Sequence, residues 1–268
     1  MKAVADHEIG GYGGPESTSE MDMRKNTLKR PGSRWAPLAI AVMCSACGPG
    51  ALAPTSGSYG VEMGEAGDCI RVNVNQLALS SNLSLDLYVE TFEMDEYEVH
   101  PIISWPGALA FYQSEEDVLT FKSIPTDNPD DWGIGATSPT SIFDGERHHL
   151  AVTWNGTRGS IFLDGEIIAY ANMDLSGSPA STLSIGCWEG VSGSFPGAIG
   201  EVRFIDGVAW EDDFEPPWTP WGVTDEVVAL WHLDEGRGEG LLDETGDFDA
   251  VLEGGTWVDF ALGDDAGE

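Results

Sequence analysis

Positive charge is scarce in this chain of 268 residues. Lysine and arginine together number 12, against 46 aspartate and glutamate residues, and the formal net charge is -34 at pH 7. Because such a charge repels phosphate backbones and anionic lipid headgroups, the composition argues against nucleic acid as a partner and against electrostatic docking on a membrane. Disorder of the whole chain is not expected either, since 41% of the residues are hydrophobic and ten are tryptophan.

Long hydrophobic runs are missing as well. The apolar stretch 35–43 is short, and it follows the segment 24–34, which carries five positive charges and no acidic residue. A helix of about eleven residues would be roughly 16 Å long, well below the ~30 Å hydrocarbon core of a membrane. A basic segment followed by a short apolar one is typical of a signal peptide. We therefore assign residues 1–46 to an upstream segment and a signal peptide that exports the rest of the chain.

The residues that follow, Cys44-Ser45-Ala46-Cys47, resemble the lipobox of bacterial lipoproteins, although Cys44 stands where that family usually has leucine. The resemblance implies that Cys47 becomes a lipid-modified N-terminus. Since Gly48 is not the aspartate associated with inner-membrane retention, it also implies an outer-membrane or cell-surface lipoprotein, whose lipid is its only contact with the membrane. The alternative is an ordinary secretory signal cut near Ala46, which would release the protein.

Helical periodicity is absent from the sequence after residue 68, where short alternating apolar runs are separated by turn residues. In 83–88, for example, leucines alternate with serine, aspartate and tyrosine, so one face of the strand belongs to a core. Asp164-Gly165 has the residue types that a type I′ hairpin prefers. The strands that we predict are 69–74, 83–91, 99–105, 109–113, 118–122, 149–154, 160–163, 167–171, 182–187, 198–205, 227–233 and 255–260.

Strands without interleaved helices predict an all-β protein with two stacked antiparallel sheets, a β-sandwich. We place this domain at residues 67–262, and we expect residues 226–260 to complete it rather than to begin a second copy. The stretch 47–66 is rich in glycine, proline, alanine and serine and reads as a flexible tether. Residues 263–268 form an acidic tail.

Cysteine is rare, with four in the whole chain. Cys69 and Cys187 are the only two that fall within the predicted sandwich. Two lone cysteines of an exported domain usually pair, because the compartment is oxidising. We therefore predict a disulfide between Cys69 and Cys187.

Four successive motifs resemble the LamG-like jellyroll family, which belongs to the concanavalin A-like lectin/glucanase superfamily and is related to pentraxins. These motifs are 144–156 (DGERHHLAVTWNG), 161–166 (IFLDGE), 183–186 (LSIG) and 195–204 (FPGAIGEVRF). The resemblance implies a jellyroll β-sandwich, and it implies a binding or adhesion module rather than an enzyme. Fold alone does not set function, so the ligand has to be argued from residues.

Catalytic motifs are missing: the chain has no G-x-S-x-G, H-E-x-x-H or phosphate-binding loop. The acidic run 93–98 is similar to the catalytic strand of retaining β-glucanases of the same superfold. Such chemistry needs two carboxyl groups about 5 Å apart on one face. Alternation along a strand places Glu93 and Asp95 together but sends Glu98 to the other face. A glucan hydrolase is therefore the alternative function, and a solvated acidic loop is the reading that we favour.

Calcium is the cofactor that an exported, acidic, lectin-like fold suggests, because it binds carboxylate and carbonyl oxygens. The place where pentraxins bind calcium holds a single carboxylate here, Glu189, so an inherited site is not expected. Other acidic loops offer weaker candidates, with solvated turns as the alternative. They are Asp127, Asp130 and Asp131, and then Asp243, Asp247 and Asp249.

Aromatic residues in loops complete the candidate binding residues, since exposed rings stack on sugars. Trp132 and Trp188 fall between predicted strands, whereas Trp218 and Trp221 suit the packing of a connecting segment onto the sandwich. The sequence therefore predicts a lipid-anchored, non-catalytic module that recognises a polysaccharide or a glycoprotein. A purely structural envelope domain is the remaining alternative.

Overall fold

Short segments with alternating apolar and polar residues form the strands of this protein, as a period of two requires. The computed structural model describes residues 59–77, 81–92, 98–114, 116–124, 135–175, 177–188 and 193–262. These residues form strands, turns and loops, and they include no helix. No helix in these ranges could therefore cross a membrane.

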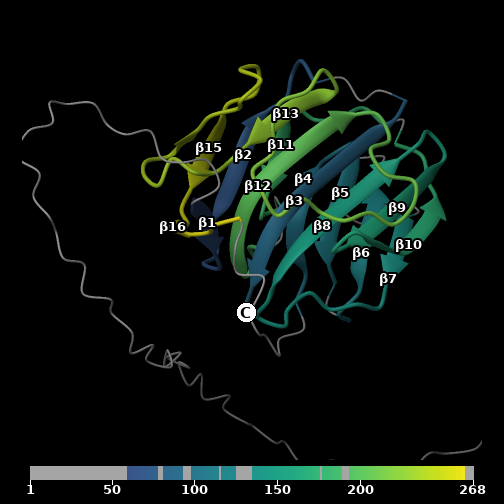
Figure 1. The fold of residues 1–268 in the computed structure, drawn as a ribbon, viewed down its shortest axis with the longest axis horizontal. Coiled ribbons are helices and arrows are strands. Elements are labelled where there is room, and N and C mark those ends of the chain that lie inside the picture. The colour runs from purple at the N-terminus through teal and green to yellow at the C-terminus, as the bar shows by residue number, and fades with distance from the viewer. Residues whose placement is uncertain are drawn as a thin grey trace, which may run out of the picture. The chain divides into compact units, whose positions relative to one another are not determined.

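Two antiparallel sheets are stacked on each other (Figure 1). The first contains, in spatial order, β10 (Glu166–Asn172), β9 (Arg158–Leu163), β8 (Arg147–Trp154), β3 (Leu83–Thr91), β12 (Gly197–Asp206), β1 (Tyr59–Met63) and β16 (Thr256–Asp259), and β13 (Val227–Trp231) also pairs with β12. The second contains β14 (Gly240–Leu241), β15 (Ala250–Glu253), β2 (Cys69–Asn73), β11 (Thr182–Ile185), β4 (His100–Trp105), β5 (Leu109–Gln113), β6 (Leu119–Ser123) and β7 (Gly135–Ser138). The prediction of an all-β antiparallel sandwich is confirmed.

The core lies between the two sheets. It is formed by the strand faces that the alternation of apolar residues predicts. Leu85 and Leu87 of β3 are fully buried in it, as are Phe111 of β5 and Phe121 of β6. Every strand that the sequence predicts is present, with ends that differ by a few residues at most. Four further strands, β1, β7, β14 and β15, were not predicted.

The tether boundary is corrected by β1, which occupies residues 59–63 of the stretch assigned to the tether. Val61 and Met63 of this strand point into the core and are almost completely buried. Gly60 lies so close to its neighbours that an added Cβ would be 2.8 Å from the carbonyl oxygen of Ile199. The glycine that suggested a flexible linker is therefore required for close packing of a strand.

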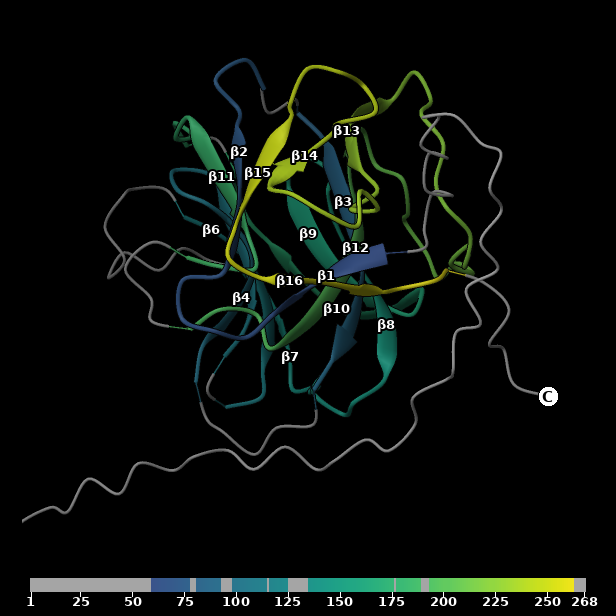
Figure 2. The same ribbon diagram turned by 90° about the vertical axis from the view of Figure 1, so that its left-hand side faces the viewer.

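The C-terminal region completes the same sandwich, as expected. β13 pairs with β12 and β15 pairs with β2, so the C-terminal region contributes strands to both sheets. β16, near the end of the described residues, pairs with β1, at their beginning, and Asp259 lies opposite Tyr59 (Figure 2). A second, truncated copy of the domain is excluded, because each of these strands fills a place in one of the two sheets.

The predicted disulfide is present. It joins Cys69, the first residue of β2, to Cys187, which follows β11, and their Cα atoms are 5.2 Å apart. The two cysteines are 118 residues apart in the sequence. The bond therefore links the beginning of β2 to the segment that follows β11.

Residues 207–226, which we call the covering segment, pack on the outer face of the first sheet. The ring of Trp221 stacks on Tyr88 of β3 with centroids 4.8 Å apart, and the Tyr88 hydroxyl donates to the carbonyl oxygen of Pro217 at 2.8 Å. Trp218 lies 5.2 Å from the Tyr88 ring and stays 38% exposed. The predicted packing role of the two tryptophans is confirmed.

A buried ionic cluster lies under the covering segment. The Arg203 guanidinium of β12 donates two hydrogen bonds to the Asp86 carboxylate of β3, at 3.0 and 2.7 Å. The Nε2 atom of His149, on β8, lies 3.2 Å from the same carboxylate. Asp86 and His149 are fully buried, and Trp221 covers the guanidinium at 4.3 Å. One carboxylate thus connects three neighbouring strands of the sheet.

Candidate functional site

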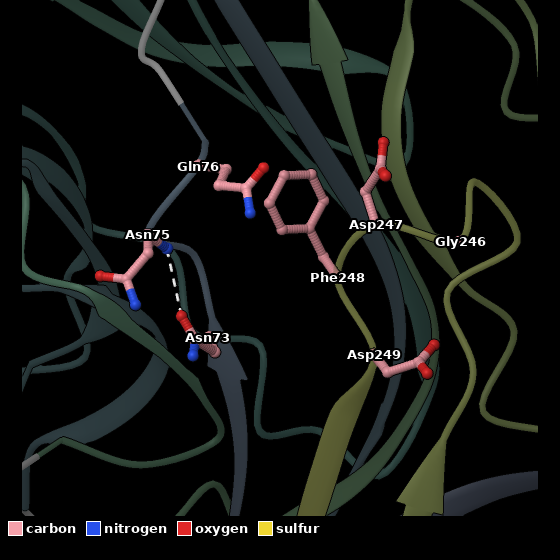
Figure 3. Close-up of a pocket in the computed structure, with 7 residues that line it drawn as sticks. All are labelled: Asn73, Asn75, Gln76, Gly246, Asp247, Phe248 and Asp249. Atoms are coloured by element: carbon pink, nitrogen blue, oxygen red, sulfur yellow. Dashed lines mark hydrogen bonds between the residues drawn. The ribbon is translucent and has the colours of Figure 1, made fainter.

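A cavity of about 330 Å³ opens at the edge of the second sheet, where the end of β2 meets the loop between β14 and β15. Its volume is at the lower end of the range of small-molecule sites. Three amide side chains, two carboxylates, one aromatic ring and one glycine line it (Figure 3). These residues are Asn73, Asn75, Gln76, Gly246, Asp247, Phe248 and Asp249.

One wall is formed where the chain leaves β2. The backbone N–H of Asn75 donates to the Asn73 side-chain oxygen at 3.2 Å, and the N–H of Leu77 donates to the carbonyl oxygen of Val74 at 2.9 Å. An asparagine that accepts from a backbone two residues on is a common device for starting a turn. The turn leaves three exposed amide side chains, those of Asn73, Asn75 and Gln76, along one side of the cavity.

The opposite wall is a loop organised around the buried carboxylate of Asp243. This carboxylate accepts hydrogen bonds from the backbone N–H groups of Leu230, Thr245, Asp247 and Phe248, and from the Thr245 hydroxyl. The indole N–H of Trp231 donates to the carbonyl oxygen of Phe248 at 2.8 Å, which ties the loop to β13. These bonds fix the loop before any ligand arrives, and a fixed loop reduces the entropic cost of binding.

The cavity offers the groups that recognise a hydroxyl-rich ligand. Amide side chains both donate and accept hydrogen bonds, and carboxylates accept them. The Phe248 ring is turned toward the amide of Gln76 (Figure 3), and only 8% of the residue is exposed, so the apolar contact that it offers is small. Small-molecule sites typically combine apolar surface with a few placed polar groups, so this geometry suits a sugar ring.

The aromatic residues predicted to stack on a ligand fall outside the cavity. Trp188 follows β11 in a loop, as expected, but its side chain is only 8% exposed and packs against Tyr112 with ring centroids 5.8 Å apart. The expectation that its ring is exposed is wrong, because Ala110 and Ile124 complete an apolar cluster around it. Trp132 lies outside the described residues. Their roles in ligand binding stay predictions.

The remaining site predictions fall mostly outside the described residues. This holds for Cys47, for Asp127, Asp130 and Asp131, and for 93–97 of the acidic run. Within the described ranges, no group of three or more His, Cys, Asp or Glu side chains could hold a metal ion. Asp243 belongs to the second acidic loop named above, and its carboxylate already accepts five hydrogen bonds. The structure gives it a structural role.

Sequence reasoning missed most of this cavity. Asp247 and Asp249 were noted as an acidic turn, but nothing marked Asn73, Asn75 and Gln76, which lie about 170 residues earlier and match no motif. A run of exposed amides directly after a buried strand was the available signal. Only the pairing of β15 with β2 brings the two segments together.

Two adjacent histidines of β8 point to opposite faces, as the strand alternation predicts. His148 lies between two carboxylates, with Nδ1 2.8 Å from Asp164 and Nε2 3.1 Å from Asp144. Burial lowers the pKa of His148, but the hydrogen bonds and charges of Asp164 and Asp144 outweigh burial, so the pKa is raised above its usual value. The ring therefore links the 164–165 turn to the 144–145 turn most strongly when it is protonated.

Replacing His148 with alanine is expected to destabilise the protein in a pH-dependent way. The pKa of His148 is higher in the folded protein than in the unfolded chain, where it is about 6.5. The contribution of His148 to stability is therefore fully present below about pH 6.5, and it disappears as the pH rises through the folded-state pKa. Burial raises the pKa of Asp144, but the hydrogen bonds from the Glu146 N–H and from His148 outweigh burial, so this pKa is lowered. The contribution of the Asp144 carboxylate to stability is therefore lost only in acid. Urea unfolding from about pH 5 to 9 should show the largest loss at the acid end. An equal loss at every pH would contradict this account.

Comparison with known proteins agrees with this architecture. A family model described as the concanavalin A-like lectin/glucanases superfamily matches residues 64–213. No curated protein matches the chain. Among solved structures, a presumed carbohydrate-binding protein from Bacteroides ovatus is similar, with 16% identity and a TM-score of 0.60. The alignment covers 77% of this chain and 61% of that chain.

Two further solved structures are more distant. The carbohydrate-binding domain CBM40 of the Ruminococcus gnavus IT-sialidase, bound to α2,6 sialyllactose, has 16% identity and a TM-score of 0.44, and the match covers 59% of this chain and 96% of that one. The SAP-like pentraxin of Limulus polyphemus has 13% identity and a TM-score of 0.42, with 57% and 78% covered. At such identities the likeness concerns the fold.

Proposed function

Because the chain belongs to the concanavalin A-like lectin/glucanases superfamily, we propose that it is an exported, lipid-anchored module that binds the glycan of a polysaccharide or glycoprotein. The observation that carries the proposal is the cavity between the end of β2 and the β14–β15 loop. There, residues with amide side chains lie across from a preorganised loop that carries Phe248 between two aspartates. This combination provides hydrogen bonds to sugar hydroxyls and a small apolar contact to a ring.

Binding rather than hydrolysis suits this cavity. Glycosidases place two carboxyl groups on opposite sides of the bond that they break. Asp247 and Asp249 both come from the same loop and form one wall, while the other wall consists of amides. The two carboxylates do not face each other across the cavity (Figure 3), so the geometry supports a non-catalytic module.

Removing the amide wall is expected to weaken glycan binding by at least tenfold. Two or three hydrogen bonds of about 0.5–1.5 kcal/mol each account for such a loss. The purified full chain and its Asn75→Ala/Gln76→Ala variant should be compared on a glycan array, with affinities for the hits measured by calorimetry. Asn172→Ala, at an exposed position of β10, is the matched control and should bind like the wild type.

Three results would count against this proposal. An array without hits would leave the structural envelope domain as the better reading. Hits that the double variant retains at full affinity would place the site elsewhere. Turnover of a β-glucan that disappears with Glu93→Gln would instead favour the hydrolase.

The lipid anchor is a separate part of the proposal, and it is supported by the Cys44-Ser45-Ala46-Cys47 sequence after a basic and then apolar segment. Mass spectrometry of the mature N-terminal peptide is expected to find a lipid-modified Cys47. A Cys47→Ala variant should then lose its membrane fractionation. An unmodified N-terminus at another residue would mean simple secretion.

A further inference from the structure

A second buried carboxylate lies under the covering segment, at its Trp221 end. Glu201 of β12 is fully buried. One of its oxygens accepts the backbone N–H of Trp221 at 2.9 Å, and the other is hydrogen-bonded to Nδ1 of His232, which follows β13. The His232 side chain is 11% exposed, so protons from solvent can reach its ring. Glu201 therefore connects the covering segment to a group of the kind that titrates near neutral pH.

Two hydrogen bonds tie this end of the covering segment to the first sheet. The Tyr88 hydroxyl donates to the carbonyl oxygen of Pro217, and the Trp221 N–H donates to Glu201. Burial and the charges of Asp86 and Glu201 raise the pKa of the Tyr88 hydroxyl, so this group stays neutral. Of the two hydrogen bonds, the one to Glu201 is therefore the one whose surroundings change charge near neutral pH.

The Glu201 carboxylate needs a positive partner, because an isolated charge in surroundings with little water is costly. The Arg203 guanidinium of the same strand already donates two hydrogen bonds to Asp86. Among the residues that the structure describes, the basic side chain in contact with Glu201 is that of His232. A neutral His232 can still donate from Nδ1, but it leaves the carboxylate charge uncompensated. Hydrogen bonds between charged partners are roughly twice as strong as those between neutral ones, so the protonated ring holds Glu201 best.

Carboxylates face the His232 ring from each element around it. Glu201 belongs to β12, Asp234 and Glu235 follow His232 in the chain, and Glu244 lies in the turn after β14. Burial lowers the pKa of His232, but the hydrogen bond and charge of Glu201 and the charges of Asp234 and Glu244 outweigh burial, so this pKa is raised. The stabilisation from the protonated ring is therefore present at the acid end and is lost as the pH rises through the raised pKa.

We infer that the contact between Glu201 and His232 is a pH-sensitive switch for the covering segment. Protonated His232 keeps the segment closed on the first sheet, and loss of that proton at higher pH loosens the segment at Trp221. The loosened segment uncovers the Tyr88 ring, on which Trp221 stacks in the closed form. This inference does not depend on glycan binding, because none of these residues lines the cavity.

Amide hydrogen exchange of the full chain, followed by NMR from about pH 6 to 8.5, tests the switch. Each exchange rate is divided by the intrinsic rate at the same pH to give a protection factor. The protection of the Trp221 N–H should fall about three- to tenfold over this range, because a charge-assisted hydrogen bond gives way to a neutral one of about half its strength. The Val74 N–H, which donates to the carbonyl oxygen of Ser181 at 2.8 Å in the second sheet, should lose less protection.

Two variants remove the charge from either side of the contact. Glu201→Gln keeps an oxygen that accepts the Trp221 N–H, and His232→Gln keeps a donor that cannot be protonated further. In both variants the protection of the Trp221 N–H should be the same at every pH. His148→Gln is the matched control, because it removes another histidine whose pKa is raised, and it should keep the pH dependence of the wild type.

Three outcomes would overturn the inference. The first needs no variant: the protection of the Trp221 N–H in the wild type does not change with pH. In the second, the pH dependence persists in His232→Gln, which would assign it to another group. In the third, Val74 loses as much protection as Trp221, which would mean that the whole domain loosens rather than the covering segment.

Discussion

Replacing Asp86 with alanine is expected to lower the free energy of unfolding by about 3–5 kcal/mol. Removing one partner of a buried ion pair has this cost because the remaining charge stays in surroundings with little water. Here the remaining charge is the Arg203 guanidinium, which is 15% exposed and lies under the ring of Trp221. The Nε2 atom of His149 would lose its partner as well. Urea unfolding analysed by linear extrapolation measures the change.

Asp259→Ala is the matched control for this prediction. Asp259 lies on β16 with an exposed side chain, so its replacement should alter stability by no more than about 0.5 kcal/mol. Asp86→Asn keeps the shape of the side chain and removes its charge, and it should fall between the two. A loss below about 1 kcal/mol for Asp86→Ala would show that the cluster under the covering segment contributes little to stability.

Removal of the disulfide is the second change with a large expected effect. In the chain-entropy model, a bond that closes a loop of this length stabilises by about 4–5 kcal/mol. The Cys69→Ala/Cys187→Ala variant should therefore unfold at a clearly lower urea concentration than the wild type. Adding a reductant to the wild type should lower its midpoint by a similar amount and should leave the variant unaffected. Equal urea midpoints for the oxidised wild type and the double cysteine variant would show that the disulfide does not stabilise the fold.

The sequence was sufficient to predict the sandwich wherever alternation was regular. β3 begins and ends at the predicted residues, because leucine and valine alternate with tyrosine and polar residues along it. β1 was missed because Gly60 and the glycines around it resemble a linker, and its need for a residue without a side chain arises only from the neighbouring strand. β14 is two residues long and leaves no periodic signal.

The candidate site was harder to predict than the fold. Trp188 was expected in a loop and is there, but whether its ring faces solvent depends on Ala110 and Tyr112 of β5 and on Ile124, which follows β6. The cavity joins residues that are distant in sequence, through the antiparallel pairing of β15 with β2. A buried aspartate such as Asp243 cannot be told from a solvated one by sequence, because its partners are backbone N–H groups brought to it by the folded loop.

The location of glycan binding tests the central claim of this account most directly. Backbone amide chemical shifts of the full chain should be followed while the tightest array ligand is titrated in. The account predicts the largest changes at Asn73, Asn75 and Gln76 and in the loop 246–249, with the ionic cluster of Asp86 and Arg203 unaffected. Saturating shifts at another surface, with these residues unchanged, would contradict it.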